Sequence, residues 1–194
     1  MKMLKYVLPL FLAASFTPSV SAMDITIEGT SVHMSGPVVG SECDQLRNIL
    51  ANNQIKNVIL GDSPGGEAEA GYCTGALIRE NGLSTSIMGS CASSCSRMWL
   101  GGITRTLTGK DSRVGFHGNY GSTGALLASS PARLRAWIPM YAPTVNRDLM
   151  EQWINLPINT NVMFFYNDRA ELCNGRDCSP IPQRNAKNVG LTTK

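Results

Sequence analysis

The chain has 194 residues, of which 43% are hydrophobic and 16% charged, and this composition excludes a disordered chain, a collagen-like repeat and a highly charged coiled coil. Seventeen basic and 14 acidic side chains give a formal net charge of +3, which is too small to indicate a nucleic-acid-binding protein. The length fits one folded domain with room for a small appendage.

The first 22 residues are typical of a secretory signal peptide. Lys2 and Lys5 begin the segment, an apolar run follows, Pro18 breaks it, and small residues precede the expected cleavage point after Ala22. The apolar run is about a dozen residues, shorter than the ~20 that span a bilayer, which favours a signal peptide over the alternative of an uncleaved membrane anchor. We therefore expect a mature domain of residues 23–194, exported across the inner membrane to the periplasm.

The segments of the mature chain alternate between strand-like and helix-like patterns. Residues 24–29 alternate apolar and polar side chains, whereas 57–60 is a short apolar run typical of a buried parallel strand. Residues 119–130 are rich in glycine, serine and alanine and are predicted to form a mobile loop. This alternation predicts an α/β domain with a mostly parallel sheet. Strands are predicted over 24–29, 31–39, 57–60, 83–88, 104–107 and 113–116, and helices over 42–52, 67–80, 131–155 with interruptions at Pro139 and Pro143, and 162–172, with another after 89–96.

All six cysteines lie in the expected mature chain. An even number in an exported protein favours disulfides. A structural zinc site would need four closely spaced ligands, and the chain has only two histidines, His33 and His117, so no metal is expected. Proximity along the sequence favours the pairs Cys91–Cys95 and Cys173–Cys178, which leaves Cys43–Cys73.

Polar residues suited to chemistry follow several of the predicted strands, and the carboxyl ends of parallel strands meet at the edge where active sites lie. The turn Ser63-Pro64-Gly65-Gly66 follows one strand, and its paired glycines would let the backbone approach a ligand. Ser93 and Ser94 begin a helix, whose N-terminus favours negative charge. A plain turn and a capped helix are the alternatives. His117 ends another strand and is a candidate base for a serine nucleophile, whereas mid-strand His33 is expected to be structural.

Three of these stretches, taken in order, resemble the Clp-type serine peptidases. That family has a Ser-Pro-Gly-Gly turn, a Gly-x-Ala-Ala-Ser segment and a Ser-Arg-x-x-x-His strand end, which correspond here to residues 62–66, 89–94 and 112–117. Residues 186–191 resemble the family's closing Ala-x-x-x-Gly-Leu. The resemblance covers roughly residues 58–191. It implies a Clp-peptidase/crotonase-like α/β fold of repeated β-β-α units with a mostly parallel sheet.

The resemblance also implies roles for individual residues. Ser93 matches the nucleophile and His117 the general base, and the backbone N–H groups of Gly65 and Ser94 match the oxyanion hole. The spacing is similar as well, with 28 residues from Gly65 to Ser93 and 24 from Ser93 to His117. The implied activity is that of a serine hydrolase, a peptidase above all, which acts by acyl transfer on a peptide or ester carbonyl and needs no cofactor.

The third member of the implied triad is an aspartate that precedes the closing Gly-Leu of the family. Asp177 lies 13 residues before Gly190 and matches that distance, with Asp168 as the first alternative and Asp148 as another. The family has alanine and glycine where this chain has Cys91 and Cys95. A disulfide between these two cysteines would stiffen the turn that carries the nucleophile.

The resemblance has consequences for partners. Clp peptidases act in the cytosol with an ATP-driven unfoldase, and the signal peptide argues against that partner here. The expected partners are a peptide or protein substrate and further copies of the same chain, because in related enzymes the segment after the histidine strand serves assembly and substrate binding.

Three alternatives to an active serine hydrolase remain. The first is a binding or scaffold protein that kept the Clp-like fold and lost the triad, which the uncertain aspartate favours. The second is a crotonase-like acyl-CoA enzyme, which the exported location disfavours because CoA is a cytosolic cofactor. The third is a thiol redox role for Cys91 and Cys95, which three intervening residues disfavour, since the usual redox motif has two.

Overall fold

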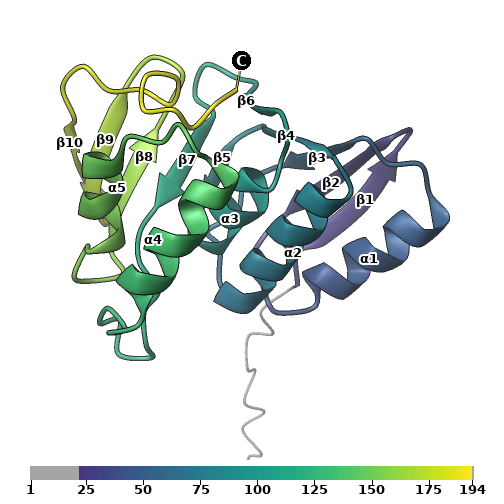
Figure 1. Ribbon diagram of the computed structural model, residues 1–194, viewed down its shortest axis with the longest axis horizontal. Helices are drawn as coiled ribbons and strands as arrows, with labels where there is room; N and C mark the ends of the chain where they lie inside the picture. The colour runs from purple at the N-terminus through teal and green to yellow at the C-terminus, as the bar shows by residue number, and fades with distance from the viewer. Residues whose placement is uncertain (1–21, 194) are drawn as a thin grey trace, which may run out of the picture.

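The computed structural model describes residues 22–193, which form two five-stranded sheets and five helices (Figure 1). The predicted signal peptide lies outside the described residues, except for its last position. Within the described part of the chain, none of the helices combines the length and apolar character that a membrane crossing requires. The helices are α1 (Glu42–Asn52), α2 (Ala68–Glu80), α3 (Ser94–Leu100), α4 (Ser130–Tyr141) and α5 (Arg147–Ile154).

The first sheet is parallel except for its N-terminal edge strand, which pairs antiparallel with its neighbour. Its central strand buries Val58 and Leu60, and helices α1 and α2 lie together over one face of the sheet (Figure 1). The predicted α/β class is therefore confirmed, together with the parallel pairing of this sheet. In spatial order the strands are β1 (Asp24–Glu28), β2 (Ser31–Ser35), β3 (Asn57–Leu60), β4 (Ser84–Ile87) and β6 (Arg105–Leu107).

The second sheet starts parallel and continues antiparallel. Strands β5 and β7 are parallel neighbours, whereas β7, β8, β9 and β10 follow one another as antiparallel pairs. Helix α5 lies across this sheet (Figure 1). In spatial order the strands are β10 (Asp177–Pro180), β9 (Ala170–Asn174), β8 (Asn161–Phe165), β7 (Arg113–Phe116) and β5 (Ser90–Ala92).

The prediction of a helix over residues 162–172 is wrong. This stretch instead forms most of β8, a turn and the start of β9. Its first half, Val-Met-Phe-Phe-Tyr, is apolar and mostly aromatic, a composition that suits a strand. Phe165 is fully buried against the rest of the core. Cys173 and Cys178 stand opposite each other on β9 and β10, and their disulfide holds the last hairpin closed.

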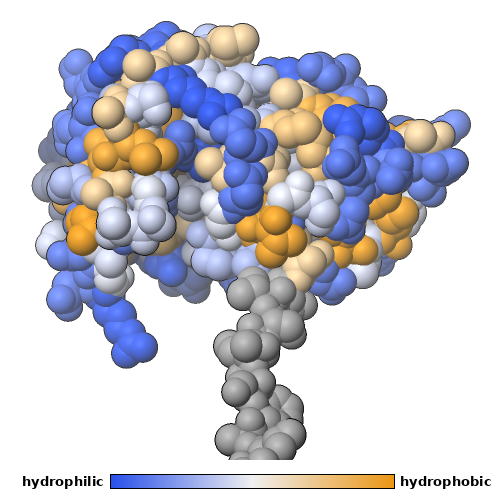
Figure 2. Space-filling view, turned by 90° about the horizontal axis from the view of Figure 1, so that it is seen from below, coloured by the Kyte–Doolittle hydropathy of each residue, from blue (hydrophilic) through white to orange (hydrophobic). Residues whose placement is uncertain are grey.

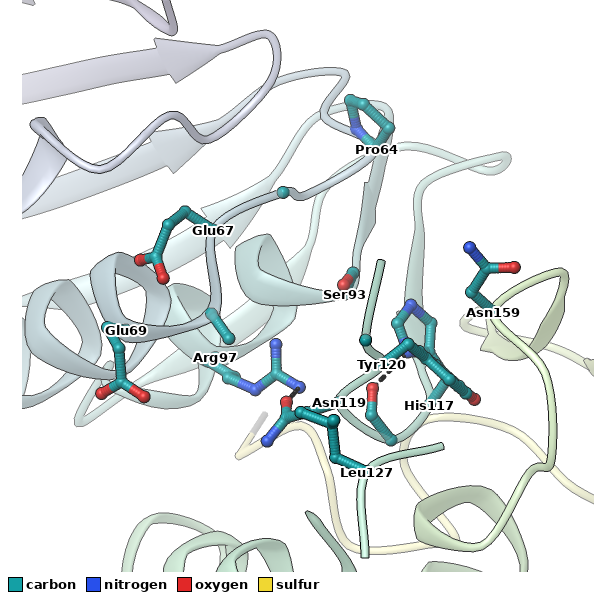
Figure 3. A pocket seen from close by; sticks show the side chains of 14 residues that line it. Pro64, Glu67, Glu69, Ser93, Arg97, His117, Asn119, Tyr120, Leu127 and Asn159 are labelled. Carbon is teal, nitrogen blue, oxygen red and sulfur yellow. Dashed lines mark hydrogen bonds between the residues drawn. The ribbon is translucent and has the colours of Figure 1, made fainter. Parts of the chain in front are cut away.

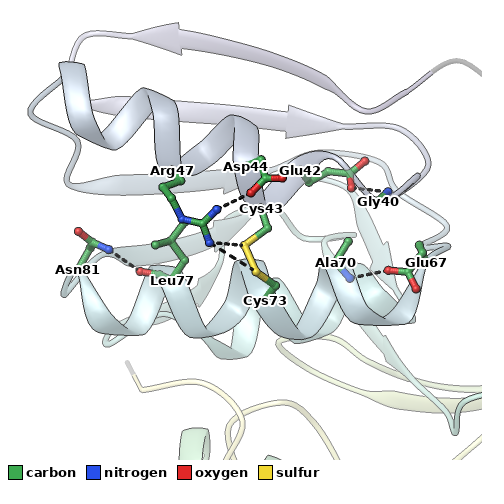
Figure 4. The surroundings of a disulfide bond; sticks show 10 residues. All are labelled: Gly40, Glu42, Cys43, Asp44, Arg47, Glu67, Ala70, Cys73, Leu77 and Asn81. Atoms are coloured by element: carbon green, nitrogen blue, oxygen red, sulfur yellow. Dashed lines mark hydrogen bonds and ion pairs between the residues drawn. A yellow bond between two sulfur atoms is a disulfide. The ribbon is translucent and has the colours of Figure 1, made fainter.

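All six cysteines are paired in the predicted way. Cys43–Cys73 joins α1 to α2 (Figure 4), Cys91–Cys95 joins β5 to α3, and Cys173–Cys178 closes the β9–β10 hairpin. Three disulfides are compatible with the oxidising compartment of an exported protein. The bond between Cys91 and Cys95 spans the turn between β5 and α3, and it fixes the geometry of that turn.

Helix α3 is buried along its whole length and packs closely against α2. Two glycines of α2 allow the two helices to approach closely. A Cβ atom on Gly71 would lie 2.6 Å from the carbonyl oxygen of Ser94, and one on Gly75 would lie 2.4 Å from that of Arg97. Since real Cβ atoms do not come so close to backbone, the helix pair requires glycine at both positions. The start of α3 is therefore held rigidly against α2.

Several large apolar side chains remain on the surface. Figure 2 shows that on the face seen from below they form separate patches between hydrophilic side chains. Scattered exposed apolar residues are ordinary on soluble proteins and do not by themselves identify an interface. Those in the described chain are Ile27, Val39, Met88, Ile103, Leu127, Met140 and Ile158.

Candidate active site

A cavity of about 580 Å³ opens where the start of α2, the start of α3 and the segment after β7 meet. Ser93 and His117 both line it, so the structure brings the two residues of the predicted catalytic pair to one pocket (Figure 3). The carboxyl ends of β3, β5 and β7 supply this edge, as expected for an α/β sheet. The other lining residues are Pro64, Gly66, Glu67, Ala68, Glu69, Arg97, Gly118, Asn119, Tyr120, Gly121, Leu127 and Asn159.

Ser93 occupies the sharp turn between β5 and α3 with φ 58° and ψ −125°. A positive φ is strained for a residue with a side chain and costs about 1–3 kcal/mol, so such residues persist where the surroundings enforce them. Here the Ser93 amide donates to the Gly115 carbonyl at 3.1 Å, and the Cys91–Cys95 disulfide spans the turn. This conformation presents the Ser93 side chain at the pocket, as Figure 3 shows.

The turn after β3 runs directly beside Ser93. Ser63 forms a parallel bridge with Cys91, and this pairing carries Gly65 to the start of α3. Gly65 has φ +85°, and a Cβ atom there would lie 2.5 Å from Ser93 Cβ and 2.9 Å from the Ser94 amide nitrogen. Only glycine fits this position. The structure therefore places the two predicted oxyanion-hole residues, Gly65 and Ser94, beside each other at Ser93.

The two amides of the predicted oxyanion hole differ in what they bind. The Gly65 N–H donates to Ser63 Oγ at 3.2 Å, so an oxyanion would compete with this hydroxyl for the donor. Ser94 is the first residue of α3, where backbone N–H groups have no partner within the helix. The positive end of the helix therefore faces the region beside the Ser93 hydroxyl.

His117 follows β7 and is held by its own neighbour in the chain. Its Nδ1 lies 2.6 Å from the Gly118 carbonyl oxygen. A carbonyl only accepts, so this contact assigns the proton to Nδ1 and leaves Nε2 with a free lone pair. The ring also packs against Tyr120, with 4.9 Å between centroids, and the Tyr120 hydroxyl donates to the Leu156 carbonyl at 3.0 Å. Within the described part of the chain, the imidazole is thus oriented by a backbone carbonyl and a tyrosine rather than by a carboxylate.

Burial also sets the charge of the imidazole. It lowers the pKa of His117 from the ordinary 6.5 to about 4, because the apolar surroundings disfavour the imidazolium ion. The hydrogen bond to the Gly118 carbonyl opposes this pKa shift, and the positive charge of Arg97 adds to it. The neutral imidazole at pH 7 is the form that accepts a proton.

The predicted aspartates do not reach this pocket. Asp177 is exposed on β10, in the hairpin that the Cys173–Cys178 disulfide closes. Asp168 is also exposed and pairs with Arg169 at 3.2 Å. Neither aspartate is among the lining residues of the cavity. The nitrogen that a triad aspartate would hold, Nδ1 of His117, is bonded to a backbone carbonyl instead.

The pocket also contains several residues that the sequence did not indicate. Arg97 lies in the first turns of α3, four positions after Ser93, and both residues line the cavity. Asn119 Oδ1 accepts a hydrogen bond from Arg97 at 2.5 Å, and the Asn119 backbone N–H donates to Ser130 Oγ. Asn159 comes from the loop before β8, and no local pattern in the sequence marks it.

The fold is crotonase-like. The chain aligns over 97% of its length with 71% of a protein named as an enoyl-CoA hydratase from Streptomyces coelicolor A3(2), with a TM-score of 0.54 and 14% identity. It aligns over 91% of its length with 77% of PA4980 from Pseudomonas aeruginosa, with a TM-score of 0.54 and 12% identity. The predicted α/β fold of the Clp-peptidase/crotonase-like type is therefore confirmed.

No known family model matches the chain, and no curated protein is significantly similar to it in sequence. The likeness to the two solved structures therefore concerns the fold, and the chemistry of this chain is argued from its own residues.

Proposed function

We propose that this protein is an exported serine hydrolase, a peptidase above all, that acts on a peptide or ester carbonyl. One observation carries the proposal: Ser93 is held in a strained turn at a cavity that also holds His117 with its Nε2 lone pair free. A nucleophile and a base at one pocket, beside backbone donors at a helix start, are the parts that acyl transfer requires. The three disulfides and the expected signal peptide support export.

The reaction would proceed in two acyl transfers. His117 Nε2 takes the proton from the Ser93 hydroxyl as the oxygen attacks the carbonyl carbon. The resulting oxyanion is held by the Gly65 and Ser94 N–H groups, each worth about 3 kcal/mol in other hydrolases. The imidazolium then gives its proton to the leaving amine or alcohol, and an acyl-Ser93 ester remains. Water attacks this ester with His117 again as base, which releases the acid and restores the hydroxyl.

In this proposal the Gly118 carbonyl takes over the orienting role that an aspartate has in a triad. It fixes the Nδ1–H tautomer of His117, so Nε2 remains the acceptor. A neutral carbonyl stabilises the imidazolium less than a carboxylate does, which agrees with the low pKa of about 4. The site is thus a Ser–His pair with a backbone orienter.

A catalytically inactive binding or scaffold protein is the second candidate. The same lack of a carboxylate at His117 favours it, because a weak base transfers protons less effectively. The fold likeness to a protein named as an enoyl-CoA hydratase raises acyl-CoA chemistry as a third candidate. Three disulfides fit an exported protein, and CoA is a cytosolic cofactor, so we place this candidate last.

Turnover of a simple ester separates the first two candidates. The mature chain with its disulfides intact is expected to hydrolyse p-nitrophenyl butyrate well above the buffer rate. Preincubation with a fluorophosphonate should remove this activity, because the reagent blocks a nucleophilic serine. A rate equal to that of heat-unfolded protein would instead favour the scaffold.

The pH dependence of this hydrolysis follows from the pKa of His117. We expect kcat/KM to rise with pH through a midpoint near 4 and to be constant above it, whereas an imidazole with its ordinary pKa would give a midpoint of 6.5. A pH series of initial rates with p-nitrophenyl butyrate measures this midpoint, and a value near 6.5 would contradict the assignment.

The free energy of unfolding should also depend on pH through the pKa of His117. The folded pKa is lower than the unfolded one, so the unfolded chain binds more protons between the two values. The stability that the neutral imidazole contributes is complete above pH 6.5 and is lost as the pH falls toward 4. Urea unfolding of the His117→Gln variant should show a shallower loss over this pH range.

A further inference from the structure

A buried arginine lines the proposed active-site cavity beside the nucleophile. Arg97 is 3% exposed, lies in α3 four residues after Ser93, and lines the pocket. Its Nη2 donates to Asn119 Oδ1 at 2.5 Å, and its guanidinium carbon lies 4.9 Å from the centre of the Tyr72 ring. Its Nε is buried without a hydrogen-bond partner. Figure 3 shows the group in the pocket, next to Asn119.

The charge of Arg97 has no ion-pair partner among residues 22–193. The acidic residues of the same pocket are engaged elsewhere. Glu69 forms a two-bond ion pair with Arg133, and a Glu67 carboxylate oxygen accepts from the Ala70 amide at 2.6 Å. Buried guanidinium groups are costly unless an anion pairs with them, so this arrangement lacks one anion.

We infer that Arg97 binds a carboxylate of the substrate, next to the carbonyl that Ser93 attacks. Guanidinium has five N–H donors in a planar fork that matches a carboxylate, and here Asn119 accepts from one of them while Tyr72 lies against the group. Glu67 and Glu69 line the same cavity, which disfavours a doubly charged phosphate and favours a single negative charge. This inference rests on the proposed hydrolase and names its substrate class as carboxylate-bearing peptides or esters.

The carboxylate can belong to the acyl part or to the leaving group, and two pairs of esters distinguish these cases. The first pair is the p-nitrophenyl monoester of glutarate and p-nitrophenyl valerate, which differ in the end of the acyl chain. The second pair is the butyryl ester of glycolate and that of glycolamide, which differ in the leaving group. For each pair the measured quantity is the ratio of kcat/KM for the charged ester to that for the neutral one.

The wild-type protein is expected to prefer the charged ester of at least one pair by about tenfold or more, because a desolvated arginine left unpaired is costly. In Arg97→Gln the ratio should fall to near one, and Arg97→Lys should keep part of the preference. The control is Arg135→Gln on α4, since Arg135 is exposed and pairs with Glu151 outside the pocket, and its ratio should match wild type.

The outcomes separate this inference from the proposed function. Wild-type ratios near one in both pairs overturn the inference and leave the hydrolase standing, as does a full preference in Arg97→Gln. If no ester is hydrolysed, the hydrolase proposal fails, and the carboxylate site is tested with valerate, which carries a single negative charge. A rise in melting temperature with valerate that Arg97→Lys weakens supports the site, and no rise for wild type overturns it.

Discussion

Replacing Ser93 by alanine is expected to lower kcat/KM for p-nitrophenyl butyrate by about three orders of magnitude or more. The reason is the loss of the proposed nucleophilic oxygen, while the cavity and the backbone donors remain. The measurement is the initial rate of p-nitrophenol release for each variant at pH 7. Ser122→Ala is the control, because Ser122 is exposed in the loop after β7 and does not line the cavity.

The variant Ser93→Gly adds a stability readout to the same test. Glycine adopts φ 58° without strain, so this variant should be as inactive as Ser93→Ala but more stable than it by about 1 kcal/mol. Urea unfolding with intact disulfides measures the difference. A Ser93→Ala protein that folds and keeps most of its activity would contradict the nucleophile assignment.

Replacing His117 by glutamine is the second large effect. We expect kcat/KM to fall by about two to four orders of magnitude, because glutamine can fill the space of the ring but cannot accept the serine proton. The pH dependence should change as well, since the group with a pKa of about 4 is gone. The remaining rate should rise smoothly with hydroxide concentration instead of reaching a plateau.

The other histidine supplies the matched control for this variant. His33 lies on β2, where its Nε2 is 3.4 Å from a Glu28 carboxylate oxygen, and it is not among the cavity residues. His33→Gln should therefore keep the wild-type rate and pH profile. A low-pH midpoint that survives in His117→Gln would assign the titration to another group and contradict the base assignment.

The sequence predicted most of the fold where local patterns decide the structure. Helices over 42–52 and 67–80 and the strand over 57–60 match the structure closely, because their hydrophobic periodicity reflects burial on one face or on both. The stretch 162–172 was predicted as a helix, although its side chains suit strands and its pairing partners β7 and β9 decide the outcome. Short β5 was missed, because three small residues become a strand only through partners distant in the chain.

In the candidate site, too, some features could be predicted from the local sequence and others depend on contacts between distant parts of the chain. Ser93, His117 and Gly65 could be predicted because each stands at a strand end within a motif of known order and spacing, and the structure brings them together. The Gly118 carbonyl could not be predicted, since every residue has one and only the ring orientation gives it a role. Asp177 was placed by distance from the chain's closing motif, and the disulfide-closed hairpin leaves it exposed.

Mass spectrometry after treatment with a fluorophosphonate tests the central assignment most directly. The reagent forms a covalent phosphonyl ester only with a serine that a neighbouring base activates. We predict one adduct per chain, located on Ser93 by peptide mapping and absent from the folded His117→Gln variant. No adduct on the folded wild-type protein, or an adduct on a different serine, would contradict the account.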